Sequence, residues 1–151
     1  MNIIIKEISA LETHKVRQPV LRKGLPASTC MFKGDELDTT FHLGAFDDED
    51  LVGVATFLKK DKSPIQELFE LPKSMYQLRG MGVLKTHQGM GVGKLLLHAA
   101  ERRLREINID VLWFHARTSA VDFYKRMGYT TVGTEIQLEP AGPHFKMYRE
   151  L

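Results

Sequence analysis

Three glycines stand at alternate positions, Gly89, Gly91 and Gly93, between a strand-like run at 76–84 and a helical pattern that continues to about Ile107. Glycine has no Cβ, so its backbone can approach a ligand closely. A helix that begins there presents unpaired N–H groups and the positive end of its dipole to an anion. The segment therefore predicts a phosphate-binding turn at the start of a helix.

Two common nucleotide-binding motifs contain similar glycines but fit this segment poorly. A P-loop needs Gly-Lys followed by Ser or Thr, whereas Gly93-Lys94 is followed by Leu95, which cannot bind Mg²⁺. The dinucleotide-binding fingerprint follows the first strand of a βαβ unit, but these glycines lie past mid-chain, although Asp110 is near the expected acidic position. A glycine-rich helix start without a ligand is disfavoured because three glycines in five residues cost much chain entropy.

Composition limits the class of protein. With 151 residues, the chain is expected to form one domain over residues 1–151. The 21 basic and 19 acidic residues leave a net charge of +2, which argues against duplex nucleic acid as a partner. Cys30 is the only cysteine, which excludes an internal disulfide framework and fits a reducing compartment. No apolar run is long enough for a signal peptide or a membrane span, so we expect a cytoplasmic protein without membrane contact.

Hydrophobic periodicity predicts an α/β fold. The expected strands are 3–8, 41–46, 51–58, 76–84, 111–115, 129–138 and 144–150. The expected helices are 11–22, 91–107 and a short one that Thr118 or Ser119 caps and Gly128 ends. Pro19 should kink or shorten the first helix. The turns are placed at the acidic run 47–50 and around Pro140, Gly142 and Pro143. The order β-α-β-β-β-α-β-α-β-β indicates a mixed, mostly antiparallel central sheet flanked by helices.

This order, the segment QGMGVG at 88–93 and the segment AVDFYKRMGY at 120–129 resemble the GNAT superfamily of acetyl-CoA-dependent N-acetyltransferases. The signature loop of that family, Arg/Gln-x-x-Gly-x-Gly/Ala, is matched by Gln88, Gly91 and Gly93. The resemblance implies that the loop amides bind the diphosphate of acetyl-CoA and that the preceding strand pairs with the pantetheine arm and polarises the thioester carbonyl. The cofactor-binding residues that it implies are Met81, Gly82, Val83, Gln88, Gly89, Met90, Gly91, Val92, Gly93, Lys94 and Ser119.

A closer likeness is to the glyphosate N-acetyltransferase branch of that family. It is carried by VLR at 20–22, FHLG at 41–44, QLRGM at 77–81, LW at 112–113, ARTSA at 116–120 and GPH at 142–144. That branch acetylates the amine of small anionic amino-acid-like compounds, using three arginines, a histidine base and a tyrosine acid. The resemblance assigns substrate binding to Arg22, Arg79 and Arg117, the base to His144 and the acid to Tyr124. It implies direct acetyl transfer in a ternary complex.

Each assigned residue also has an ordinary structural interpretation. An arginine presents a planar fork suited to carboxylate or phosphonate, but a lone arginine is usually a solvated surface charge. His144 follows Gly-Pro and could be a turn histidine. Tyr124 could belong to the core, although Phe123 and Tyr129 are placed to take that packing role.

Three departures from the branch bear on the acceptor: His115 stands where the branch has Asn, Pro19 lies in the first helix, and Gly82 replaces alanine. The sequence therefore leaves two alternatives, a protein or peptide N-acetyltransferase and a non-catalytic acetyl-CoA sensor. It also leaves the oligomeric state open, with a homodimer compatible. No metal is expected, because the remaining histidines, His14, His42, His87 and His98, lack ligand spacing.

Overall fold

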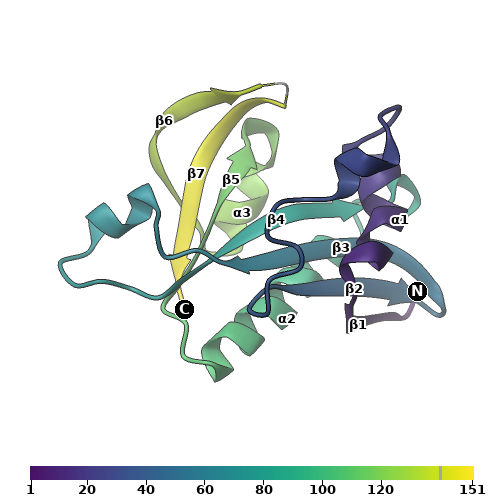
Figure 1. Cartoon of the computed structure of the whole chain (residues 1–151), viewed down its shortest axis with the longest axis horizontal. Coiled ribbons are helices and arrows are strands. Elements are labelled where there is room, and N and C mark those ends of the chain that lie inside the picture. Colours follow the sequence, from purple (N-terminus) through teal and green to yellow (C-terminus); the bar gives the residue numbers. More distant parts are fainter. Residues whose placement is uncertain (140) are drawn as a thin grey trace. The chain divides into compact units, whose positions relative to one another are not determined.

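Seven strands form one mixed sheet in the order β1-β2-β3-β4-β5-β7-β6 (Figure 1). The computed structural model describes residues 1–139 and 141–151, so the expected turn residue Pro140 lies outside the described part of the chain. The chain divides into unit 1, which is Met1–Lys59 with Leu78–Arg103, and unit 2, which is Lys60–Gln77 with Leu104–Leu151. Strand β4 (Met75–Val83) and helix α2 (Val92–Glu106) contribute residues to both units.

Unit 1 begins with three antiparallel strands, β1 (Ile3–Ile8), β2 (Phe41–Asp47) and β3 (Asp50–Lys59). Helix α1 (Ala10–Leu21) packs against β2 and β3 (Figure 1). Ile8, Val16 and Val54 form a buried apolar cluster between α1 and these strands. The remaining short elements of this unit are the 3₁₀ turns η1 (Ala27–Cys30) and η3 (Lys85–His87).

Helix α1 has a well-defined start and continues through its proline. Ser9 accepts a hydrogen bond from the Glu12 amide, and Glu12 accepts one from the Ser9 amide, which forms a capping box. Pro19 is expected to kink or shorten this helix; it does not shorten it, because the helix runs on to Leu21. At the end of the helix, the Arg22 amide donates hydrogen bonds to the carbonyls of Arg17 and Gln18, at 3.0 and 3.3 Å.

Unit 2 combines one parallel strand pair with two antiparallel pairs. The start of β4 pairs in parallel with β5 (Val111–Arg117), from Met75 opposite Val111 to Gln77 opposite Trp113. Strand β7 (Gly142–Glu150) lies antiparallel between β5 and β6 (Thr130–Leu138). Helix α3 (Val121–Arg126) packs against β6. The 3₁₀ turns of this unit are η2 (Pro64–Leu68) and η4 (Thr118–Ala120).

The predicted α/β class, the order of elements and the mostly antiparallel mixed sheet are confirmed. The predicted cap of the last helix is wrong. Helix α3 begins after Ala120, which makes no side-chain cap. Thr118 instead donates its hydroxyl to Glu135 Oε2 at 2.7 Å, so it is not available to the helix start.

One buried ion pair joins α1 of unit 1 to the long segment before β2. The Arg17 side chain is 0% exposed, and its two terminal nitrogens contact the two carboxylate oxygens of Asp35 at 2.6 and 3.0 Å. The same guanidinium donates to the Cys30 carbonyl at 2.7 Å and to Thr56 Oγ1 at 2.7 Å. These contacts fix the segment 30–35 to the helix and to β3.

The ion pair continues into a chain of buried hydrogen bonds. Thr56 Oγ1 accepts from Arg17 and also lies within hydrogen-bond distance of His42 Nδ1, 2.7 Å away. His42 Nε2 then carries the proton that it donates to the Asp35 carbonyl at 3.0 Å. The network therefore starts and ends on Asp35.

We expect Asp35→Asn to destabilise the protein by about 3 kcal/mol at pH 7, because it leaves the buried Arg17 charge unpaired. Burial alone would raise the pKa of Asp35, but hydrogen bonds from Arg17 and the Phe32 amide, with the Arg17 charge, hold this pKa below its usual value. A lowered pKa contributes stability that is present above about pH 4, the unfolded value, and is lost as the pH falls below it.

Urea unfolding of wild type and Asp35→Asn at pH 7 and pH 3 measures the loss of stability at pH 7 and its dependence on pH. The variant should lose less stability than wild type between these two pH values. Glu36→Gln is the matched control, because this adjacent carboxylate is exposed and has no ion pair or hydrogen bond among the residues described. Equal pH dependence in wild type and Asp35→Asn would contradict the prediction.

Candidate active site

The glycine turn of unit 1 connects β4 and η3 to helix α2. Gly89 and Gly91 adopt φ of +76° and +82°, a conformation that other residues rarely take. A Cβ built on either glycine meets nothing within 4 Å, so the backbone faces open space. The first turn of α2 carries no acidic side chain, which leaves the positive end of the helix uncompensated. This turn has the geometry and the charge of an anion site.

The residues around these glycines divide between structural and accessible positions. Gln88 is tied back to the end of β4, because its Nε2 donates to the Val83 carbonyl at 2.9 Å. Val92 is buried, and its side chain packs against Gly53. Met90 and Lys94 are exposed, whereas Gly93 lies inside the first turn of α2. Backbone amides, more than side chains, are therefore what this turn presents.

A hydrogen bond between His87 and Asp47 connects the turn to the β2–β3 hairpin of unit 1. His87 Nε2 lies 2.8 Å from Asp47 Oδ2, and His87 Nδ1 lies 2.8 Å from Thr86 Oγ1. The hydrogen bond from His87 is the main reason why the pKa of Asp47 is lowered. The glycine turn is thus held from one side by Asp47 and from the other by Gln88.

The predicted cofactor strand, Met81, Gly82 and Val83, forms the end of β4. Gly82 lies where α1 comes close to the strand, and a Cβ there would stand 3.2 Å from Val20 Cγ1. This contact gives a physical reason for glycine where the resembling branch has alanine. The close approach keeps α1, which carries Arg22 at its end, against this strand.

Two of the predicted substrate arginines meet around one aromatic ring in unit 1. The Cζ atoms of Arg22 and Arg79 lie 4.8 and 5.7 Å from the centroid of Phe32, and Arg17 lies 3.9 Å from it. These distances are within the range of cation–π attraction. Gly80 makes room for the ring, because a Cβ there would stand 2.6 Å from Phe32 Cε2.

Both arginines are oriented by backbone carbonyls. Arg22 donates to the carbonyls of Thr29 and Leu21 at 3.2 and 3.0 Å, and Arg79 donates to that of Lys33 at 3.2 Å. Burial lowers the pKa of Arg79, Asp35 opposes that shift, and the charges of Arg17 and Arg22 add to it. Asp35 is already engaged by Arg17, so the two outer guanidiniums retain positive charge that can bind an anion.

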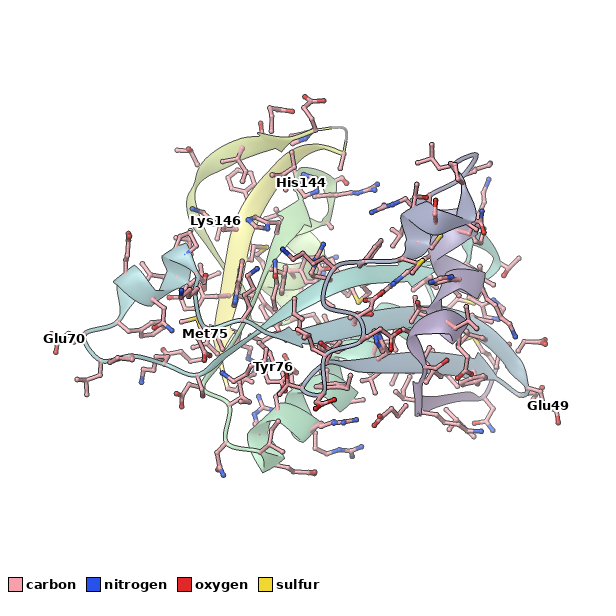
Figure 2. All side chains as sticks on the ribbon, viewed as in Figure 1. Glu49, Glu70, Met75, Tyr76, His144 and Lys146 are labelled. Atoms are coloured by element: carbon pink, nitrogen blue, oxygen red, sulfur yellow. The ribbon has the colours of Figure 1, made fainter. Side chains whose placement is uncertain are left out.

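The third predicted arginine and the predicted base are neighbours in unit 2. Arg117 on β5 lies directly opposite His144 on β7, and Figure 2 shows His144 near the start of β7. His144 is 6% exposed, and its Nδ1 lies 2.8 Å from the Gly142 carbonyl. A carbonyl oxygen only accepts, so Nδ1 carries the proton and Nε2 of the neutral ring has a free lone pair.

The predicted acid, Tyr124, belongs to the same unit but to the other face of β5. Its ring packs 4.4 Å from that of Phe114, whose side chain points away from the face of His115 and Arg117. Tyr124 is therefore part of the aromatic core together with Tyr129, and the prediction that its neighbours alone fill that role is wrong. Burial raises the pKa of Tyr124, and its hydroxyl has no hydrogen-bond partner within the described chain.

The last predicted cofactor residue, Ser119, is exposed in η4 of unit 2. Within residues 1–139 and 141–151, no cluster of His, Cys, Asp and Glu side chains is suited to a metal ion. In the same residues, none of the helices has the length and apolar character needed to span a bilayer.

Sequence reasoning did not identify Arg17, Phe32, Asp35 and Gly80 as parts of the arginine cluster. Arg17 could have been noticed, because it lies on the same helical face as Ala10 and Thr13, which the structure buries. A charged side chain on a buried face needs a partner, which points to an acid elsewhere in the chain. Nothing in the sequence distinguishes Phe32 from other loop aromatics.

Comparison with known proteins identifies the class of this fold. Residues 7–129 match the model of the acetyltransferase (GNAT) family, and the chain belongs to that family. It is 31% identical to the uncharacterized N-acetyltransferase YitI of Bacillus subtilis, over 97% of this chain and 95% of that protein. The family match and this relative make the chain an acyl-CoA-dependent N-acetyltransferase.

Solved structures share the fold at lower identity. The crystal structure of a putative N-acetyltransferase from Lactobacillus plantarum superposes with a TM-score of 0.78 at 18% identity, covering 100% of this chain and 99% of that one. An aminoglycoside 6'-N-acetyltransferase complexed with coenzyme A gives 0.73 at 13% identity, covering 97% and 96%. These likenesses confirm the GNAT-type fold, and the glyphosate N-acetyltransferase branch stays a prediction.

We expect Gly91→Ala to weaken acetyl-CoA binding about tenfold, because a left-handed alanine costs about 1–2 kcal/mol and the turn relaxes to avoid it. Gly133→Ala is the matched control, since Gly133 has φ +70° and open space but lies in β6. Calorimetric titration with acetyl-CoA should separate the two variants at similar melting temperatures. Unchanged affinity in Gly91→Ala would contradict a role of this turn in binding.

Proposed function

We propose that the chain transfers acetyl from acetyl-CoA to the amine of a small, anionic, amino-acid-like acceptor. The observation that carries the proposal is the pair of guanidiniums, Arg22 and Arg79, held around the Phe32 ring. Two cations at one place repel each other, and the charge of Arg22 does contribute to the lowered pKa of Arg79. An acceptor with acidic groups would neutralise both, and a guanidinium fork suits carboxylate and phosphonate equally.

The glycine turn fits the diphosphate of acetyl-CoA. Gly89 and Gly91 leave open space at the backbone, and the start of α2 offers amides and a positive dipole, with no acidic side chain in its own first turn. Met81, Gly82 and Val83 precede this turn on β4 and would bind the pantetheine arm, with Ser119 of unit 2 as a further predicted contact. When bound, acetyl-CoA supplies the acetyl group as a thioester, which the amine converts to an amide with release of the thiol.

His144 is the proposed base. Its Nδ1 proton is held by the Gly142 carbonyl, so Nε2 takes the proton that the attacking amine loses. Arg117, directly opposite on β5, would bind an acidic group of the acceptor beside that nitrogen. The backbone of Val83 would polarise the carbonyl that is attacked.

Tyr124 is the proposed acid. Burial raises its pKa, so the phenol stays protonated at neutral pH and has a proton to give to the sulfur that leaves. The C–S bond breaks as the C–N bond forms, the amine proton goes to His144 and the Tyr124 proton goes to the thiolate. Solvent exchange then restores both side chains.

We further propose that residues 1–151 act as one acetyltransferase domain. The match to the Lactobacillus plantarum structure covers the whole chain, which supports this organisation. A protein or peptide acceptor is the competing proposal, and a screen of acceptors distinguishes it from a small anionic acceptor.

Tyr124→Phe and His144→Ala should each lower kcat about 100-fold, because each removes one proton transfer. The dissociation constant of acetyl-CoA should change less than twofold, since neither side chain is assigned to cofactor binding. Steady-state kinetics with a competent acceptor and calorimetry with acetyl-CoA measure the two quantities. Near-wild-type turnover in both variants would refute these roles.

The acceptor class is tested by screening acidic amino acids, aminophosphonates, neutral amines and peptides for acetyl-CoA-dependent thiol release. We expect turnover with acidic amines, and a KM for them that rises tenfold or more in Arg79→Ala, since hydrogen bonds to charged groups contribute about 1.5–3 kcal/mol. As a control, Arg102→Ala removes one arginine charge from the exposed side of α2. Turnover with peptides but not with acidic amines would support the competing acceptor.

A further inference from the structure

Four basic side chains lie together on one face of unit 2. The register of β5 and β7 places Arg117 opposite His144 and His115 opposite Lys146. Residues two apart on a strand share a face, and directly paired residues of antiparallel strands share it too. His144 and Lys146 therefore stand in line along β7 (Figure 2), and His115 and Arg117 stand beside them on β5.

The same face is apolar further along both strands. Trp113 belongs to a buried cluster with Ile65, and Phe69 and Tyr148 pack against it. Trp113 is opposite Tyr148, so the face changes from apolar to basic within one pair of residues. On β6, the residues opposite Lys146 and His144 are Val132 and Ile136, which bring no charge.

The charges on this face are not balanced by the sheet. Arg117 is exposed and Lys146 is half-buried, and neither has an ion pair or hydrogen bond among residues 1–139 and 141–151. No carboxylate occupies a paired position beside them on β5, β6 or β7, and the nearby Glu135, in the unpaired bulge of β6, accepts a hydrogen bond from Thr118. Like charges on neighbouring positions of a sheet face are unfavourable. Two such cations are stabilised when an anion lies between them.

We propose that Lys146 is a further acceptor-binding residue, which forms with Arg117 a two-cation subsite for a carboxylate or phosphonate group. The inference rests on the proposed function and adds to it a group outside the predicted set. Directly opposed positions are about 5 Å apart at Cβ and diagonal ones about 7–8 Å, so Arg117 and Lys146 can reach one anion from two sides. Arg117 offers a planar fork and Lys146 a compact point charge.

The competing interpretation is that Lys146 only packs its aliphatic stem on the sheet. Lys146→Met distinguishes the two, because methionine keeps the stem and removes the charge. Lys62→Met is the matched control, since Lys62 is an exposed lysine in the loop before η2 of the same unit. Lys146→Arg restores the cation and serves as the rescue variant.

In steady-state kinetics, we expect Lys146→Met to raise the KM for an acceptor with two acidic groups about tenfold. The kcat, the KM for acetyl-CoA and the melting temperature should change little, and Lys146→Arg should recover most of the acceptor KM. Lys62→Met should leave all four quantities unchanged. An unchanged acceptor KM in Lys146→Met would overturn the inference while leaving the proposed function intact.

A binding measurement separates this inference from the proposed reaction. Methylphosphonate is titrated into wild type and Lys146→Met, and the imidazole resonances of His115 and His144 are followed by NMR. Shifts that saturate in wild type and need about tenfold more ligand in Lys146→Met would support the subsite even if no acidic amine is acetylated. Equal titrations in the two proteins would overturn it.

Discussion

The buried ion pair between Arg17 and Asp35 is the contact on which the arrangement of unit 1 depends. Taking two charges out of water is costly, and their attraction offsets that cost only when the remaining donors and acceptors are satisfied. Here Thr56 and the Cys30 carbonyl accept from the same guanidinium and the Phe32 amide donates to the same carboxylate at 3.0 Å, whereas the buried Nε of Arg17 has no hydrogen-bond partner among the residues described. The pair therefore specifies where Phe32 lies more than it adds net stability, and Phe32 in turn determines how closely the outer arginines approach.

That arrangement also explains why a group of cations without a carboxylate partner forms on a chain with little net charge. Asp35 is committed to the inner arginine, so it cannot neutralise Arg22 or Arg79. The aromatic ring accepts cations on its face without cancelling their charge, and backbone carbonyls take only part of their hydrogen-bonding capacity. In unit 2, strand register puts Arg117 and Lys146 on one face with no carboxylate at a directly paired position. The net charge of the chain alone would not have revealed the pair Arg22 and Arg79 or the pair Arg117 and Lys146.

How much the sequence predicts depends on whether a feature is local. The glycine turn, the strands and α2 follow from spacing and periodicity, and the structure places them within a residue or two of the predicted bounds. Contacts between residues that are far apart in the sequence do not follow from local spacing or periodicity. Nothing near Arg17 in sequence indicates Asp35 or Thr56, and the position of His144 opposite Arg117 follows only from the register of β7 against β5. The family resemblance predicted the candidate site residues together. It did not predict what surrounds each of them, because Tyr124 packs against Phe114 in the aromatic core.

Two parts of the proposed chemistry, the choice of the His144 tautomer and the binding of acetyl-CoA at the glycine turn, depend on the backbone conformation of glycines. Gly142 has φ +94°, and its carbonyl holds the Nδ1 proton of His144, so backbone conformation rather than a neighbouring carboxylate selects the tautomer. A carboxylate in that place would have competed with the acceptor for Arg117, which lies directly opposite His144. Gly89 and Gly91 would likewise present amides to acetyl-CoA without adding a charge. In both places, using the main chain would leave the nearby cations available to the proposed acidic acceptor.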